Sequence, residues 1–210
     1  MNVEIWSDVM CPFCYIGKRK FEAALDQFPH KDQINVIWKS FQLNPDMPTD
    51  PSRSVLDYLA EVKGIPLAQA EQMHDHVTAM AREVGLEYHF DKAVVANSFD
   101  AHRFIQLAKQ HGLGDAAEER IFRAYFTEGR NTADHTTLTE LGTEIGLDKI
   151  EVEKMLQTDA FTEAVEQDIY ESRQIGVRGV PFFVINRKYA VSGAQPPETF
   201  LGALQTAWAE

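Results

Sequence analysis

The sequence predicts an α/β fold in which a small sheet with its helices is interrupted by a long, all-helical block. Residues 2–7 and 33–41 alternate apolar and polar side chains, as half-buried strands do, and an apolar stripe of helical spacing over residues 21–28 separates them. Apolar residues then recur at steps of three and four across residues 55–169. Strand character returns in residues 180–193, and a last helix follows.

A loop rich in Pro, Asp and Ser, residues 42–54, is the expected domain boundary. We therefore expect a discontinuous sheet domain of residues 1–45 and 176–210, with a helical insertion domain of residues 46–175 between its halves. The turn around Asn186 to Lys188 is short enough for a hairpin between the two late strands.

Composition narrows the range of partners. The chain has 210 residues, 44% of them hydrophobic and 25% charged, which suits a globular protein with a real core. Its net charge of −12 repels phosphate backbones, so nucleic acid is not an expected partner. No run of apolar residues approaches the length of a membrane span. The N-terminus lacks signal-peptide features, so we expect a cytoplasmic protein unless a leader was removed. The sequence leaves monomer and homodimer open.

Both cysteines of the chain lie in the segment "CPFC", directly after the first predicted strand. Pro12 suits the first position of a helix and disfavours helical geometry at the residue before it, so Cys11 is expected at the N-cap. Cys14 lies three residues on, in the same turn. Side chains at that spacing are ~5–6 Å apart at Cβ, and a disulfide needs ~3.5–4.5 Å. A slight tightening of the turn therefore switches the pair between dithiol and disulfide.

The position of each sulfur suggests its role. A helix N-terminus stabilises negative charge by about 0.3–1 kcal/mol, which favours a Cys11 thiolate. We expect Cys11 to be the more exposed sulfur and the nucleophile. Cys14, which lies deeper along the helix, is expected to resolve the mixed disulfide. Phe13 cannot donate a hydrogen bond to the sulfur, so the reduced form should be stabilised only moderately.

Other interpretations of the cysteine pair are less favoured. A zinc site needs about four ligands, and no second pair of ligands at suitable spacing is present. Two idle buried thiols would leave the intervening proline without a reason. Asp8, three residues before Cys11, could relay a proton to Cys14, but a turn-forming or capping role is favoured.

Two motifs carry a family resemblance. "SDVMCPFCYIGK", followed much later by "GVRGVPFFVINRKYAVSGAQPPE", resembles the DsbA family of thioredoxin-fold proteins, and the FrnE-like branch of dithiol–disulfide isomerases in particular. The resemblance implies a thioredoxin-like fold with a helical insertion. It also implies a cis-proline at Val180–Pro181, facing the cysteines and positioning substrate. Pro12 and Phe13 are expected to join this substrate site.

The resemblance implies thiol–disulfide exchange with protein or small-molecule substrates, with no metal and no cofactor beyond the dithiol. Glutathione is an open co-substrate. One alternative is a glutathione-dependent isomerase or transferase of the kappa-class type, for which Asn97, Ser192 and Gly193 could contribute to a glutathione pocket. Such enzymes typically have serine where Cys11 stands. A second alternative is a chaperone-like module whose working surface is the helical block.

Overall fold

The computed structural model describes residues 1–210 as two compact units. The first comprises Met1–Leu43 and Glu163–Glu210, and the second comprises Asn44–Thr162. The first boundary lies close to the one expected from the Pro-rich loop. The second boundary differs from the expected one. The sequence assigned helix α8 (Thr162–Gln174) to the helical insertion, whereas in the structure it packs with the sheet.

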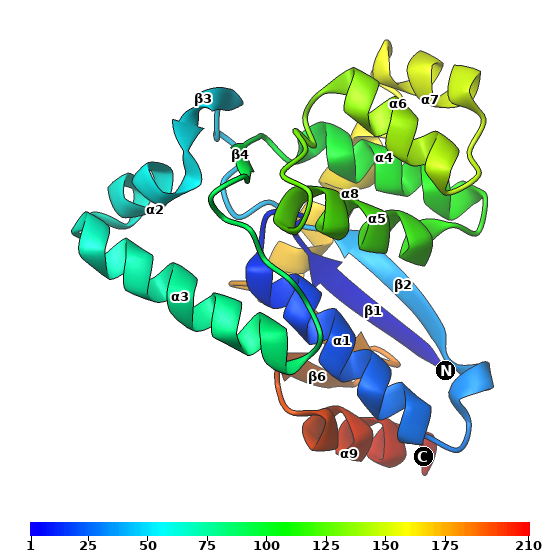
Figure 1. Ribbon diagram of the computed structural model, residues 1–210. Coiled ribbons are helices and arrows are strands. Elements are labelled where there is room, and N and C mark those ends of the chain that lie inside the picture. The colour runs from blue at the N-terminus through cyan, green and yellow to red at the C-terminus, as the bar shows by residue number, and fades with distance from the viewer. The chain divides into compact units, whose positions relative to one another are not determined.

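The first unit is built on a four-stranded sheet (Figure 1). Its strands are β1 (Asn2–Ser7), β2 (Asn35–Ser40), β5 (Phe182–Ile185) and β6 (Tyr189–Ser192), in the spatial order β2-β1-β5-β6. Strands β1 and β2 are parallel, joined through helix α1 (Pro12–Gln27) and the short 3-10 helix η1 (Lys31–Gln33), and the other two pairings are antiparallel. The predicted hairpin is present: Lys188 N–H donates to the Ile185 carbonyl at 3.0 Å.

One face of the sheet holds the aromatic core. Helix α1 and the C-terminal helix α9 (Pro197–Trp208) pack there, as their places in Figure 1 show. Phe183 from β5 lies 5.4 Å from the ring of Phe21 and 4.6 Å from that of Phe200. All three side chains are fully buried. This packing fixes α1, and with it the cysteine pair, against the sheet.

Helix α8 is attached to the other face by polar contacts. The Trp6 indole donates to the backbone carbonyl of Asp168 at 2.9 Å. The Asp168 carboxylate accepts from Lys39 at 2.8 Å and from the Ser40 N–H at 3.0 Å. Burial lowers the pKa of Lys39, but its bonds to Asp168 and Glu171 outweigh burial and leave that pKa raised. The helix therefore docks through a salt-bridge network, which apolar periodicity does not reveal.

The second unit is mainly helical, as predicted. Its helices are α2 (Val55–Lys63), α3 (Leu67–Glu83), α4 (Phe99–Gln110), α5 (Gly114–Phe126), α6 (His135–Glu144) and α7 (Lys149–Leu156). Asp134 and Asp148 cap α6 and α7 through their side chains. A short antiparallel pair, β3 (Asp50–Ser54) with β4 (Val94–Val95), was not predicted, because neither segment shows strand alternation.

The core of the helical unit consists of side chains from α4, α5 and α6. Phe104, Phe122, Phe126, Leu138 and Leu141 are all fully buried. No helix of the chain is both long enough and apolar enough to cross a membrane.

Candidate active site

The cysteine pair begins helix α1, as predicted. Cys11 is the N-cap residue with extended backbone angles (φ −87°, ψ 112°), and Pro12 occupies the first helical turn. The Cys11 N–H donates to the Asp8 carbonyl at 2.9 Å, and the Cys14 N–H donates to the Cys11 carbonyl at 3.0 Å. These two bonds hold both cysteines in one tight turn between β1 and α1.

Both thiols are free, and both are buried. Cys11 is 3% exposed and Cys14 is 1% exposed. Cys11 is the more exposed of the two, as expected, but only slightly, and the reduced pair is less accessible than the sequence suggested. Its sulfur turns toward the Val180 carbonyl, to which it donates a hydrogen bond at 3.5 Å. A loop from the far end of the chain thus meets this sulfur, which local sequence could not indicate.

The surroundings of Cys14 favour its protonated form. Burial, then the hydrogen bond and charge of Cys11, raise the pKa of the Cys14 thiol well above its ordinary value. A backbone hydrogen bond from Asp8 and the side chain of Ser7 lower the same pKa by less. Cys14 therefore holds its proton until a reaction step draws it away.

The Val180–Pro181 bond is cis, as the sequence motif implied. Pro181 is buried, and its carbonyl accepts from the Gly193 N–H at 2.8 Å. On α1, an added Cβ at Gly17 would lie 2.8 Å from the Pro181 Cγ. Only a glycine at this position of the helix leaves room for the proline ring.

Comparison with known proteins supports this reading of the geometry. Residues 2–205 match the model of the DSBA-like thioredoxin domain. The chain belongs to the DsbA-like thioredoxin domain family. We therefore describe it as a DsbA-like oxidoreductase.

Individual relatives resemble this chain over nearly its whole length. The crystal structure of a probable DsbA oxidoreductase, SCO1869 of Streptomyces coelicolor, is 42% identical with a TM-score of 0.94, covering 100% of this chain and 91% of that one. YwbO of Bacillus subtilis, an uncharacterized protein, is 27% identical over 212 residues, covering 97% of this chain and 96% of YwbO. The cytosolic disulfide reductase DsbM of Pseudomonas aeruginosa shares the fold, with a TM-score of 0.72 and 19% identity. The match covers 100% of this chain and 99% of DsbM.

The other predicted site residues of this DsbA-like chain fall in different places. Pro12 is half-buried and Phe13 is 40% exposed, both in the first turn of α1 beside the sulfurs. The Asp8 carboxylate accepts from the Leu43 N–H at 2.8 Å, which anchors the chain after β2. That contact and the turn to Cys11 fit the turn-forming role favoured from sequence.

Of the residues suggested for a glutathione pocket, Gly193 lies at the cis-proline loop, where its N–H donates to the Pro181 carbonyl, whereas Asn97 is engaged in the helical unit. The Asn97 side-chain amide donates to the Pro45 carbonyl at 3.0 Å and the Met47 carbonyl at 2.8 Å. Its oxygen accepts from the Phe99 N–H at 2.9 Å, at the start of α4. Asn97 therefore acts as a local anchor and cap in the helical unit.

Sequence reasoning missed two members of the site, Ser7 and Gly17. Gly17 carried a signal, because glycine inside an amphipathic helix is unfavourable without a packing reason. Ser7 carried none, since a serine at the end of a strand is common and only the fold places it beside Cys14.

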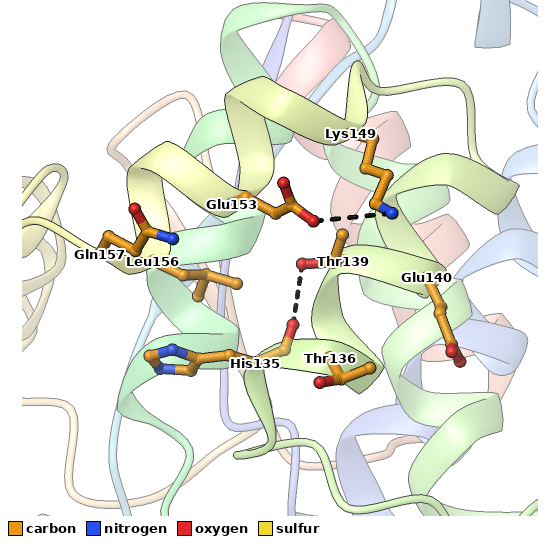
Figure 2. A pocket seen from close by; sticks show the side chains of 8 residues that line it. All are labelled: His135, Thr136, Thr139, Glu140, Lys149, Glu153, Leu156 and Gln157. Atoms are coloured by element: carbon orange, nitrogen blue, oxygen red, sulfur yellow. Dashed lines mark hydrogen bonds and ion pairs between the residues drawn. The ribbon is translucent and has the colours of Figure 1, made fainter.

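A cavity of about 290 Å³ in the helical unit contains none of these residues. Figure 2 shows its polar lining from α6 and α7, where the Thr139 hydroxyl donates to the His135 carbonyl and Lys149 pairs with Glu153 at 3.7 Å. Two other lining groups pair outside the cavity, the His135 ring with Asp100 and the Glu140 carboxylate with Arg130. No group of three or more His, Cys, Asp or Glu side chains gathers anywhere in the chain to hold a metal ion.

Proposed function

We propose that this protein is a protein disulfide oxidoreductase or isomerase that exchanges disulfides through Cys11 and Cys14. Cys11 is the attacking sulfur, Cys14 is the resolving sulfur, and the Val180–Pro181 loop positions the substrate. The asymmetry of the pair carries this proposal: the Cys11 sulfur lies at the helix N-cap and contacts the Val180 carbonyl, whereas Cys14 is deeper and holds its proton.

In the first step, the Cys11 thiolate attacks a substrate disulfide. A bond forms between Cys11 and one substrate sulfur, the substrate S–S bond breaks, and the departing sulfur takes up a proton. The N-terminus of α1 stabilises the negative charge of the attacking sulfur. Loss of the Cys11 proton also ends its hydrogen bond to Val180. The Val180 carbonyl can then accept an amide N–H from an extended substrate.

In the second step, Cys14 resolves the mixed disulfide. Because the pKa of Cys14 is raised, little of it is thiolate near neutral pH, so this step is slow. A long-lived mixed disulfide gives the substrate time to rearrange, which supports an isomerase. Release of the substrate from this mixed disulfide then requires attack by a small thiol. The structure of DsbM with glutathione supports glutathione as that co-substrate here, and the description of DsbM as cytosolic supports a cytoplasmic location.

The test is an insulin-reduction assay and a scrambled-ribonuclease refolding assay, both with glutathione. Wild type should accelerate both reactions, and Cys11→Ser should return both to the uncatalysed rate. Thr206→Ala, at an exposed position on helix α9, serves as the control and should behave as wild type. Full activity in Cys11→Ser would contradict the proposal.

The same variants separate the alternatives. Retained activity of Cys11→Ser toward glutathione and an aromatic electrophile would indicate a kappa-class type of enzyme. Suppression of client aggregation by the double variant Cys11→Ser, Cys14→Ser, without any exchange activity in wild type, would indicate a chaperone-like module.

A further inference from the structure

The fold directs the side chain of Ser7 toward helix α1. Side chains along a strand alternate between its two faces. Val3 and Ile5 of β1 belong to the core that α1 covers, and Trp6 points the other way, to Asp168 on α8. Ser7 ends the strand on the α1 side, where the first turn of the helix carries the two cysteines.

The hydroxyl of Ser7 is buried without a partner. Ser7 is 1% exposed, and its Oγ makes no hydrogen bond. Its backbone carbonyl, in contrast, accepts from the Phe41 N–H at 3.0 Å. A buried hydroxyl without a partner destabilises the folded state. Such a group in a well-packed site requires an explanation.

The reacting sulfur of Cys14 supplies that explanation. The Ser7 side chain lies close enough to Cys14 to lower the pKa of its thiol, against burial and Cys11, which raise it. A neutral thiol accepts hydrogen bonds weakly, whereas a charged acceptor binds a donor about twice as strongly as a neutral one. The hydroxyl therefore lacks a good partner while Cys14 is protonated and gains one when Cys14 ionises.

We infer that Ser7 is a catalytic hydrogen-bond donor whose hydroxyl stabilises the Cys14 thiolate each time that sulfur attacks or leaves. The inference rests on the proposed function, in which Cys14 resolves the mixed disulfide. Ser7 works there beside the backbone N–H of Asp8, which also stabilises the charged sulfur. Stabilising the Cys14 thiolate in this way does not require the side-chain carboxylate of Asp8.

Resolution is a thiol–disulfide exchange between Cys14 and the mixed disulfide on Cys11. With substrate bound to Cys11, the Cys14 thiol releases its proton to solvent and its thiolate attacks the Cys11 sulfur. The Cys11–Cys14 bond forms, the bond from Cys11 to the substrate breaks, and the substrate sulfur leaves as a thiolate that takes up a proton. In this step Cys14 is oxidised and the substrate sulfur is reduced; over both steps the cysteine pair loses two electrons and the substrate disulfide gains them. In the reverse direction the Cys14 thiolate is the leaving group, and Ser7 stabilises the same charge.

The other ionisable groups around Cys14 do not replace Ser7. Cys11, on the same turn, raises the pKa of Cys14. The Asp8 carboxylate is bonded to the Leu43 N–H. Lys18, one turn further along α1, pairs with Glu22. Among the groups shown to act on Cys14, Ser7 is the side chain that favours its thiolate.

The test titrates Cys14 by itself. In a Cys11→Ser background it is the single cysteine of the chain, and its thiolate is followed by ultraviolet absorbance against pH. Adding Ser7→Ala should raise the pKa of Cys14, and Ser7→Gly, which cannot clash, should do the same. Ser7→Thr keeps the hydroxyl and should restore the parent value. Ser40→Ala, which removes another buried serine hydroxyl at the position opposite Ser7 in the register of β1 and β2, should leave the pKa unchanged.

The kinetic counterpart uses protein with both cysteines. Ser7→Ala should slow resolution of a glutathione mixed disulfide on Cys11 about tenfold at neutral pH, the factor for a hydrogen bond worth about 1.4 kcal/mol. An unchanged pKa in both Ser7→Ala and Ser7→Gly overturns the inference, as does a raised pKa that Ser7→Thr does not restore. Because the titration requires no exchange activity, its failure is distinct from failure of the proposed function.

Discussion

Two sulfurs in one helical turn acquire different properties from their immediate neighbours. Cys11 ends an extended segment and contacts the Val180 carbonyl, while Cys14 lies inside the turn. Burial and the adjacent Cys11 raise the pKa of Cys14. Exposure hardly distinguishes the two residues, since both are almost completely buried.

This difference predicts a pH-dependent stability of the reduced protein. The folded state holds the Cys14 proton more tightly than the unfolded chain, so the free energy of unfolding falls as pH rises above the ordinary value of 9.0 toward the raised pKa. Below that value the contribution is fully present. The loss should approach about 1.4 kcal/mol per pH unit. Urea unfolding of the reduced protein against Cys14→Ala measures it, and parallel curves for the two proteins would contradict it.

At the scale of elements, helix α1 and the Pro181 loop pack closely because Gly17 has no side chain. Gly17→Ala would place a methyl group 2.8 Å from the Pro181 Cγ. Overpacking of this kind costs about 1–3 kcal/mol, and the shifted loop should also slow exchange at Cys11.

The matched control for this change lies on α9. An added Cβ at Gly202 meets nothing within 4 Å, so Gly202→Ala should be neutral or stabilise the helix by up to about 1 kcal/mol. Urea unfolding and insulin reduction compare the two variants. Equal stability and equal activity of both would show that the contact between α1 and the loop is unimportant.

The docking of α8 on the sheet makes a second element-scale prediction. Asp168→Ala leaves Lys39, whose side chain is only 16% exposed, without its closest partner and the Ser40 N–H without an acceptor. Breaking such a buried pair should destabilise the protein by about 3 kcal/mol. Glu153→Ala in the exposed pair with Lys149 should cost less than about 1 kcal/mol. Thermal unfolding of both variants distinguishes the buried network from a surface pair, and similar losses would contradict the account.

At the scale of the whole molecule, the sequence was informative wherever local pattern determines structure. Alternation placed β1 and β2, and the proline after Cys11 placed the start of α1. The motif around Pro181 placed the loop that contacts Cys11. Each of these depends on neighbours along the chain or on a motif, which a single sequence displays.

The remaining features depend on contacts between distant residues. Helix α8 was assigned to the insertion because helical periodicity does not state which core a helix joins; its anchor, Asp168 to Lys39, spans 129 positions. The burial of Cys11 was missed for the same reason, since the Val180 carbonyl comes from the other end of the chain. Membership of the FrnE-like branch and the isomerase activity stay predictions.

The central claim is that Cys11 accepts the substrate and Cys14 releases it, and trapping tests this most directly. Each protein is incubated with oxidised glutathione, and the adduct is located by peptide mass. Cys14→Ser should retain a mixed disulfide on Cys11, wild type should convert its mixed disulfide to the Cys11–Cys14 disulfide, and Cys11→Ser should form little adduct. The account would be contradicted if Cys14 in the Cys11→Ser variant formed the glutathione adduct as fast as Cys11 does in the Cys14→Ser variant.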